Sequence, residues 1–287
     1  MSVDVPMQRA PSFSVLMSVY YKENSSYLRE SLSSVFSQSL QPAEVVLVED
    51  GPLTKDLDTV VEEFTIKHQN LKVIFLPVNS GLGTALNEGL KHCSYDIVAR
   101  MDSDDICKPN RFKKQIGYMH LHPEIDVCSA WIDEFQTGIE NIISTKRLPE
   151  TNKEIFEYGK RRCPINHPVS VFRKSAVYAA GGYLHYPLFE DYYLWARMLV
   201  GGAKFYNFQE SLLWFRTTPS MFQRRGGWNY AITEIRLQFL FVGIGYIGFG
   251  RFLKNVIIRF SVRIMPNSIR MVIYNLFLRN QSNHANP

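Results

Sequence analysis

The sequence comprises 287 residues, of which 46% are apolar and 21% charged, and its formal net charge is +5. This is the composition of an ordinary globular protein that can bury a large core, in one large domain or two small ones. The four cysteines stand far apart without a Cys-Xaa-Xaa-Cys pair, which argues against a zinc site and a disulfide scaffold. No secretory signal pattern opens the sequence, so we expect a cytoplasmic, reducing environment.

Short apolar runs alternate with helical patterns in the first half of the chain. Val45–Val48 is apolar throughout and ends in a turn signal, whereas residues 25–38 repeat apolar side chains at helical spacing. Strands that are apolar on both faces and separated by helices form a parallel sheet with helices on each side. We therefore expect an α/β fold with strands over residues 13–20, 45–48 and 72–76, a fourth strand leading into residues 102–105, and helices over 25–38, 55–68 and 83–92.

The second half of the chain has weaker patterns. Residues 132–165 show little periodicity and mixed charge, and Gly181–Tyr183 predicts a loop. Carboxylates in the first turn of a helix are favoured by its dipole, and Glu190 and Asp191 stand where a helical pattern begins. We expect helices over Arg111–Leu121 and from Glu190 to Met198, and strands over Val127–Trp131 and His167–Lys174.

The most informative stretch is an acidic cluster directly after the apolar run Ile97–Ala99. It contains Asp102, Asp104 and Asp105. Carboxylate oxygens at the end of a strand suit Mg²⁺ or Mn²⁺ rather than zinc, and ligands bind at the carboxyl ends of strands in open α/β sheets. The cluster therefore predicts a metal-bound phosphate at the sheet edge, and the alternative is a solvated acidic turn.

Polar groups follow three strands that would end at the same edge of a parallel sheet. They are Tyr20 after the first strand, Asp50 after the second, and Asp102 with Asp104 after the fourth. No Gly-Xaa-Gly-Xaa-Xaa-Gly fingerprint and no Gly-Lys-Ser/Thr phosphate loop is present. A metal held by Asp102 and Asp104 could neutralise a diphosphate instead. Asp50 could accept a hydrogen bond from a nucleobase edge, and Tyr20 could pack against the ring.

Five motifs in order and approximate spacing resemble those of inverting, nucleotide-sugar-dependent glycosyltransferases of family 2. The matching segments are Phe13–Tyr20, Val46–Gly51, Asn79-Ser80-Gly81 through Asn87-Glu88-Gly89, Arg100–Asp105, and Glu190-Asp191 with Leu194-Trp195. The resemblance covers about residues 12–220 and is closest to bacterial enzymes of exopolysaccharide and O-antigen assembly, particularly of the amylovoran type. It implies the glycosyltransferase-A fold, a mostly parallel Rossmann-like sheet flanked by helices.

The resemblance also implies roles for particular residues. Asp50 corresponds to the base-binding aspartate, Asp102 and Asp104 to the metal and diphosphate motif, and Asp191 to the catalytic base. For Asp191 the alternative is a helix N-terminal acid, and for Asp105 it is a turn or capping role. The donor-binding set is expected to be Tyr20, Asp50, Asn79, Arg100, Asp102, Asp104, Arg224 and Arg225.

The implied reaction is one inverting displacement on a nucleotide sugar. The implied partners are a donor, with a UDP-sugar as the default, a Mn²⁺ or Mg²⁺ ion, and a lipid-diphosphate-linked saccharide acceptor, with no nucleic acid. The Gln-Xaa-Xaa-Arg-Trp motif of processive members is absent, because the segment reads Gln223–Trp228 as QRRGGW, so we expect addition of a single sugar. Leu86 stands where relatives commonly have Arg, and one donor contact is therefore lost or moved.

Two further groups have open interpretations. Arg224 and Arg225 could bind the diphosphate, since Arg recognises phosphate through two parallel hydrogen bonds, or they could belong to the basic tail. His167 could face the acceptor, although a lone His is more often a satisfied structural residue.

The last part of the chain is basic and amphipathic. Residues 221–287 carry nine Arg or Lys side chains and one acid, Glu234. The apolar run Leu237–Gly250 is too short to span a membrane, which needs ~20 apolar residues. The segments from residue 251 and after Pro266 repeat apolar side chains at helical spacing, with Arg251, Arg259 and Arg263 on another side.

These patterns predict amphipathic helices that lie on an anionic membrane surface, and the alternative is that they pack on the catalytic domain. We expect an N-terminal extension over residues 1–11, a catalytic domain over 12–220 and a helical region over 221–287, at the inner face of the cytoplasmic membrane.

Two other functions use similar sequence features. A nucleotidyltransferase that makes a nucleotide sugar would have a Gly-rich basic loop after the first strand, but the loop here is Tyr20–Asn24. A non-catalytic sugar- or nucleotide-binding module would not need Asp102, Asp104 and Asp191 together.

Overall fold

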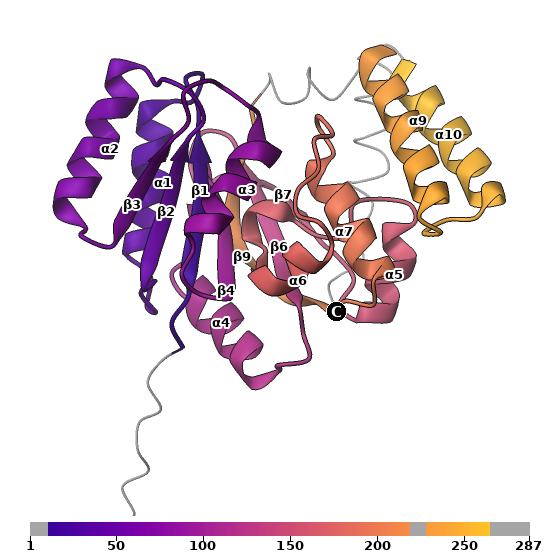
Figure 1. Ribbon diagram of the computed structural model, residues 1–287, viewed down its shortest axis with the longest axis horizontal. Helices are drawn as coiled ribbons and strands as arrows, with labels where there is room; N and C mark the ends of the chain where they lie inside the picture. The colour runs from indigo at the N-terminus through magenta and orange to yellow at the C-terminus, as the bar shows by residue number, and fades with distance from the viewer. Residues whose placement is uncertain (1–10, 219–227, 265–287) are drawn as a thin grey trace, which may run out of the picture. The chain divides into compact units, whose positions relative to one another are not determined.

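The computed structural model describes residues 11–218 and 228–264 (Figure 1). By their contacts these residues fall into two compact units, one ending at Thr217 and the other beginning at Thr218. The first unit contains a sheet flanked by helices, and the described residues of the second unit form two helices. The predicted residues Arg224 and Arg225 and the helix after Pro266 lie outside the described residues.

The described residues form a nine-stranded sheet in the order β3-β2-β1-β4-β8-β6-β9-β5, with β7 paired to β6. The strands that stand next to each other in the order β3-β2-β1-β4 are all parallel, and β6 also runs parallel to β9. The strands are β1 (Ser14–Val19), β2 (Glu44–Glu49), β3 (Leu71–Phe75), β4 (Ile97–Asp102), β5 (Ile106–Cys107), β6 (Val127–Phe135), β7 (Ile142–Lys146), β8 (Val171–Arg173) and β9 (Phe205–Arg216).

Helices cover both faces of the parallel part, as the buried strands predicted. Alternate side chains of β1 point to opposite faces, so Val15 and Met17 share a core with Leu28 of α1 and Leu57 of α2. On the other face α3 packs closely, because a Cβ at Gly89 would lie 2.4 Å from Leu16 Cδ1. The helices are α1 (Ser25–Phe36), α2 (Lys55–Lys67), α3 (Leu82–His92), α4 (Arg111–Leu121), α5 (Asn152–Gly159), α6 (Lys174–Ala179) and α7 (Glu190–Val200).

The expected edge of the sheet exists. In the register of the sheet Val19 stands beside Glu49, and Ser18 stands beside Asp102. The carboxyl ends of β1, β2 and β4 therefore lie side by side, which confirms the prediction that the polar groups following these strands share one edge. The predicted bounds of the α4 helix are also confirmed.

One predicted strand is wrong over half its length. His167–Val169 is a turn of 3₁₀-helix, β8 covers only Val171–Arg173, and α6 begins at Lys174. The reason is Pro168, which has no amide hydrogen for a strand ladder and fixes the backbone at helix-like φ.

In the second unit the structure describes α9 (Trp228–Gly243) and α10 (Phe249–Ile264), which pack against each other. Polar pairs lie in their interface: Arg259 pairs with Glu234, which is buried, and Asn255 donates to Gln238 at 2.7 Å. Arg259 therefore does not lie on an outward basic face as the spacing had suggested. Within residues 11–218 and 228–264, the helices are all too short or too polar to cross a bilayer.

Candidate active site

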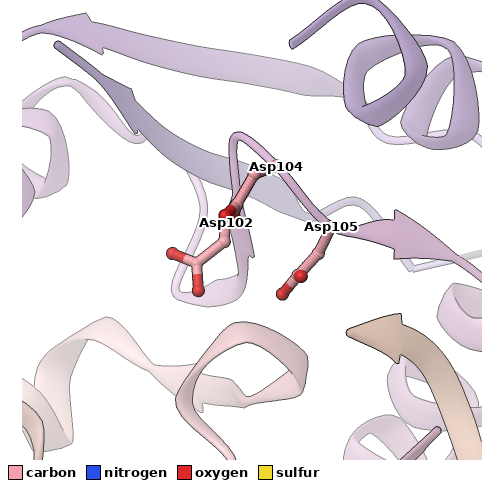
Figure 2. Close-up of side chains that lie close together, drawn as sticks. All are labelled: Asp102, Asp104 and Asp105. Atoms are coloured by element: carbon pink, nitrogen blue, oxygen red, sulfur yellow. The ribbon is translucent and has the colours of Figure 1, made fainter. Parts of the chain in front are cut away.

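The acidic cluster lies at the carboxyl end of β4, in the turn that leads to β5. One carboxylate oxygen from each of Asp102, Asp104 and Asp105 lies within 4.8 Å of the other two. Figure 2 shows the three side chains directed to the same side of this turn. The structure thus brings the two predicted metal ligands together and adds Asp105, whose role the sequence left open.

The electrostatics of the cluster favour a cation. Burial and the neighbouring Asp102 and Glu23 raise the pKa of Asp104 to about 7. Burial, then Asp104 and Asp102, raise the pKa of the fully buried Asp105 well above its ordinary value. Oδ2 of Asp105 has no hydrogen-bond partner among the described residues. An oxygen-only set of crowded carboxylates fits Mg²⁺ or Mn²⁺ and can hold such an ion.

Arg216, at the end of β9, holds the acidic turn in place and was not identified from the sequence. Its backbone amide donates to Asp105 Oδ1 at 2.8 Å and its Nε donates to the carbonyl of Asp104 at 2.8 Å. Its guanidinium also pairs with Glu30 and lies 3.9 Å from the ring centre of Tyr27. The two ends of this contact are 111 residues apart, so no local pattern could have indicated it.

Arg100, predicted to contact the donor, lies in the interior beside Asp102. It is 1% exposed and forms an ion pair with the Asp102 carboxylate. Its Nε has no hydrogen-bond partner in the part of the chain that the structure describes. From the protein interior, Arg100 therefore offsets part of the negative charge of the acidic cluster.

Asp50 is buried at the end of β2 and connects this edge to α3. Its Oδ1 accepts from the amide of Ser80 at 2.6 Å and its Oδ2 from the amide of Gly81 at 3.0 Å. Asn79 donates to the backbone carbonyl of Asp50 at 3.1 Å. Each carboxylate oxygen can accept a second hydrogen bond, so a nucleobase contact remains compatible with this arrangement.

Gly51, the residue after Asp50, has a φ of +83°, and a Cβ there would lie 2.6 Å from the amide nitrogen of Asn79. The turn after β2 therefore requires glycine, which keeps Asp50 and Asn79 close together. Tyr20 follows β1 with a partly exposed ring packed edge-on to Tyr21 at 5.8 Å. Leu86 is fully buried in α3 and does not reach this edge.

Asp191 lies in the first turn of α7, partly exposed, as the sequence predicted. The thiol of Cys163 lies 3.7 Å from its Oδ2. The adjacent Glu190 is also partly buried, and burial and the Asp191 charge raise its pKa to about 7. Asp191 is not one of the carboxylates gathered within 4.8 Å in the acidic cluster, so the site has two separate acidic centres.

Tyr183 lies between the two centres. Its ring hydroxyl is 2.9 Å from Nε2 of His167, and both side chains are buried. The charges of Arg100, Asp191 and Asp102 all act on the Tyr183 hydroxyl, whose pKa is raised mainly by burial. Burial and Arg100 hold the pKa of His167 well below its ordinary value. The buried contact with Tyr183 supports a structural role for His167.

Comparison with known proteins identifies the family. The sequence profile of "Glycosyl transferase family 2" matches residues 14–179. The chain belongs to this family. The match includes the acidic cluster and Asp50 but ends before Asp191, so it supports the fold and general activity without testing individual residue roles.

Two curated relatives span nearly the same length. The chain is 40% identical to the amylovoran biosynthesis glycosyltransferase AmsE of Erwinia amylovora, over 91% of this chain and 97% of the relative. It is 39% identical to the UDP-Gal:alpha-D-GlcNAc-diphosphoundecaprenol beta-1,3-galactosyltransferase of Escherichia coli, over 94% of this chain and 97% of the relative. The chain is thus a glycosyltransferase similar to these enzymes along most of its length.

A solved structure shares the fold. The structure of S. aureus TarS 1-349 in complex with UDP-GlcNAc superimposes with a TM-score of 0.62 and 20% identity, covering 79% of this chain and 66% of that chain. This similarity supports the predicted glycosyltransferase-A fold.

Proposed function

We propose that this protein transfers one sugar from a UDP-sugar to a saccharide linked to a lipid diphosphate, with inversion at the anomeric carbon. The acidic cluster of Asp102, Asp104 and Asp105 carries the proposal. It is a divalent-metal site at the sheet edge of a family 2 chain, where a departing nucleoside diphosphate needs positive charge. The proposed catalytic domain covers residues 12–220.

The residues divide the reaction between the two acidic centres. Asp191 is the proposed general base, which takes the proton of the acceptor hydroxyl as it attacks the anomeric carbon, a contribution of typically 10²–10⁴-fold. Asp102 and Asp104 would hold a Mn²⁺ or Mg²⁺ ion, which stabilises the charge of the leaving diphosphate. Asp50, with Tyr20 and Asn79, would bind the nucleoside. Attack from the face opposite the leaving group makes an α-linked donor give a β-linked product.

The substrate classes follow from the relatives. The E. coli relative is named for UDP-galactose as donor and for a GlcNAc-diphosphoundecaprenol acceptor, and the Erwinia relative for amylovoran biosynthesis. We therefore propose UDP-galactose as the first donor to test and a lipid-diphosphate-linked GlcNAc as the first acceptor, in bacterial surface polysaccharide assembly.

The test is transfer of sugar from a panel of UDP-hexoses to a synthetic GlcNAc-diphosphate lipid, with Mn²⁺, Mg²⁺ or EDTA. We expect a β-linked product by NMR and a loss of transfer in EDTA or on Asp104→Asn. Asp56→Asn, on the exposed first turn of α2, is the matched control and should leave the rate unchanged. An α-linked product, or full activity in EDTA, would overturn the proposal.

The second unit supports a peripheral position on an anionic membrane surface, at its cytoplasmic face. Phe249, Leu253 and Ile257 are spaced four residues apart along α10 and are 64%, 46% and 66% exposed. Lys254 is exposed beside them. An exposed apolar row with basic neighbours is the pattern of a helix that lies in the membrane interface, where each basic residue adds ~1 kcal/mol at an anionic surface.

Flotation with liposomes containing anionic phosphatidylglycerol tests this assignment. The intact chain should float at low salt, and Ile257→Glu should abolish flotation because it places a carboxylate in the apolar row. Ile66→Glu, at an exposed apolar position of α2 in the first unit, is the control and should float as the unchanged chain does. Equal flotation of the two variants, or none for the unchanged chain, would exclude the membrane role of α10.

A further inference from the structure

The proposed base depends on a loop that is anchored far from it in sequence. Residues 180–189 connect α6 to α7 and lead directly into the first turn of α7, which contains Asp191. This loop has unusual backbone geometry: Gly181 and Gly182 have φ values of +84° and +68°, and Leu188 has a φ of +77°. The two glycines adopt these values without strain, whereas the positive φ of Leu188 persists only where surrounding contacts impose it.

Asn87 of α3 holds this loop by two hydrogen bonds. Its Nδ2 donates to the carbonyl of Tyr183 at 2.6 Å, and its Oδ1 accepts from the amide of Tyr183 at 2.8 Å. We call this pair of hydrogen bonds the Asn87 clamp. It satisfies both backbone groups of one loop residue, as a neighbouring strand would. A Cβ at Gly182 would lie 2.8 Å from Asn87 Oδ1, so the clamp also requires glycine there.

The same face of α3 contacts α7 directly. Gly83 and Asn87 are four residues apart and therefore lie one above the other on the helix. A Cβ at Gly83 would be 3.2 Å from Cγ of Glu190, the residue next to Asp191. The side chain of Tyr183 is fixed at its other end by His167, at 2.9 Å. The loop between α6 and α7 and the first turn of α7 are thus both in contact with α3.

The N-terminal end of α3 lies at the nucleotide edge, by which we mean the edge of the sheet where Asp50 is proposed to bind the nucleobase of the donor. The first turn of α3 begins at Gly81, and Asp50 accepts hydrogen bonds from the amides of Ser80 and Gly81. A rigid helix of eleven residues therefore joins Asp50, the proposed nucleobase-binding residue, to the loop that leads to Asp191, the proposed general base.

We propose that Asn87 is a positioning residue: the Asn87 clamp fixes Asp191 relative to the donor, and through it α3 transmits the position of the nucleotide edge to the base. This proposal rests on the proposed function, because it takes Asp191 as the base. Neither Asn87 nor Tyr183 is among the residues proposed to bind the donor or the metal, so loss of the clamp should change the rate of transfer without changing nucleotide affinity.

The first test measures kcat and UDP affinity in the presence of Mn²⁺. Asn87→Ala removes the clamp and should lower kcat ~10- to 100-fold, the scale expected for a displacement of about 1 Å at a reacting group. The dissociation constant of UDP should change less than ~2-fold, because Asp50 and the acidic cluster keep their contacts. Asn87→Asp keeps the side-chain volume but cannot donate to Tyr183 when ionised, and it should lower kcat as well.

Asn70→Ala is the matched control. Asn70 is also partly buried and its Nδ2 also donates to a backbone carbonyl, that of Pro42 at 3.0 Å, but it precedes β3 at the opposite edge of the sheet. The Asn70→Ala variant should lose this side-chain hydrogen bond to the backbone and still keep the kcat of the unchanged chain. A fall in kcat with Asn70→Ala equal to that with Asn87→Ala would reduce the clamp to a general stability effect and overturn the proposal.

The decisive test is a double-mutant cycle with Asp191→Asn. If the clamp acts through the base, Asn87→Ala lowers kcat in the unchanged chain but by less than ~2-fold when Asp191 is already replaced. Equal losses in the two backgrounds would show that Asn87 acts independently of Asp191 and would refute the clamp alone. Near-normal turnover with Asp191→Asn by itself would refute the proposed base instead, so the two failures are distinguishable.

Discussion

Replacing Asp104 should stabilise the metal-free protein while it abolishes activity. Asp104 lies in a partly buried turn within 4.8 Å of two other carboxylates, and its pKa is raised from 3.8 to about 7. The unfolded chain loses this proton near pH 4 and the folded chain near pH 7. Between these values the folded state binds more protons, so the stability of the folded state falls as pH rises from 4 to 7.

The size of the effect follows from the shift. About three pH units at ~1.4 kcal/mol each give ~4 kcal/mol above pH 7, and because the carboxylate is partly open to solvent we take about half, ~2 kcal/mol. For a unit of this length that corresponds to a melting temperature about 4–8 °C higher in Asp104→Asn than in the unchanged chain. Below about pH 3 the carboxyl is protonated in both states and the difference should vanish, and at pH 4.5 it should be small.

A bound metal should reverse the order of the two melting temperatures, so that the unchanged chain melts above Asp104→Asn. A cation offsets the repulsion in the unchanged chain, and ligand at 100 times its dissociation constant adds ~2.7 kcal/mol to the folded state. Asp104→Asn loses a ligand and should gain little. The assay is thermal unfolding at pH 4.5 and pH 8.5 with EDTA or Mn²⁺, with Asp56→Asn as the control that shows no pH-dependent difference.

If Asp104→Asn melts at or below the temperature of the unchanged chain in EDTA at pH 8.5, the carboxylates do not repel one another and the electrostatic case for a cation site fails. A Mn²⁺-induced increase of equal size in both chains would show that the ion binds elsewhere.

Three further substitutions test other parts of the site. Asp191→Asn should lower turnover by ~10²-fold or more while UDP affinity survives, since it removes only proton transfer; near-normal turnover would contradict the assignment. Arg216→Lys keeps the charge but not the bond from Nε to the carbonyl of Asp104, and it should weaken Mn²⁺ binding ~10- to 100-fold in a titration followed by electron paramagnetic resonance. His167 has a lowered pKa, so its contribution to stability is present above pH 6.5 and is lost as pH falls below it; His167→Gln should therefore melt below the unchanged chain at pH 7.5, with the gap narrowing towards pH 5.

The parallel sheet and the acidic cluster could be read directly from the sequence because they depend on local patterns. Runs such as Val45–Val48 are apolar on both faces, as is typical of a buried strand, and the helical spacing of Arg111–Leu121 predicted the bounds of α4. Once four strands are parallel, their carboxyl ends must share an edge. The proximity of Asp102 to the end of β2 followed from topology alone, without knowledge of any contact.

Local patterns failed at two places, for two different reasons. His167–Val169 has the composition of a strand, but Pro168 turns it into a 3₁₀ segment. The spacing around Arg259 indicates an outward basic face, but the buried carboxylate of Glu234 on another helix draws it inward. Pro168 stands within the pattern itself and outweighs its strand-like composition, whereas the contact between Arg259 and Glu234 is not visible in the window of residues that sets the helical spacing.

The amino-acid sequence alone determined the α/β class, the family and the two acidic centres, because periodicity and short motifs are encoded in neighbouring residues. Only the tertiary structure decided how those centres are held. Arg216 reaches Asp105 across 111 residues, and Asn87 reaches Tyr183 across 96. Polar side chains form such bonds because a buried backbone group without a partner is costly, and which side chain satisfies it is settled only when the chain has folded.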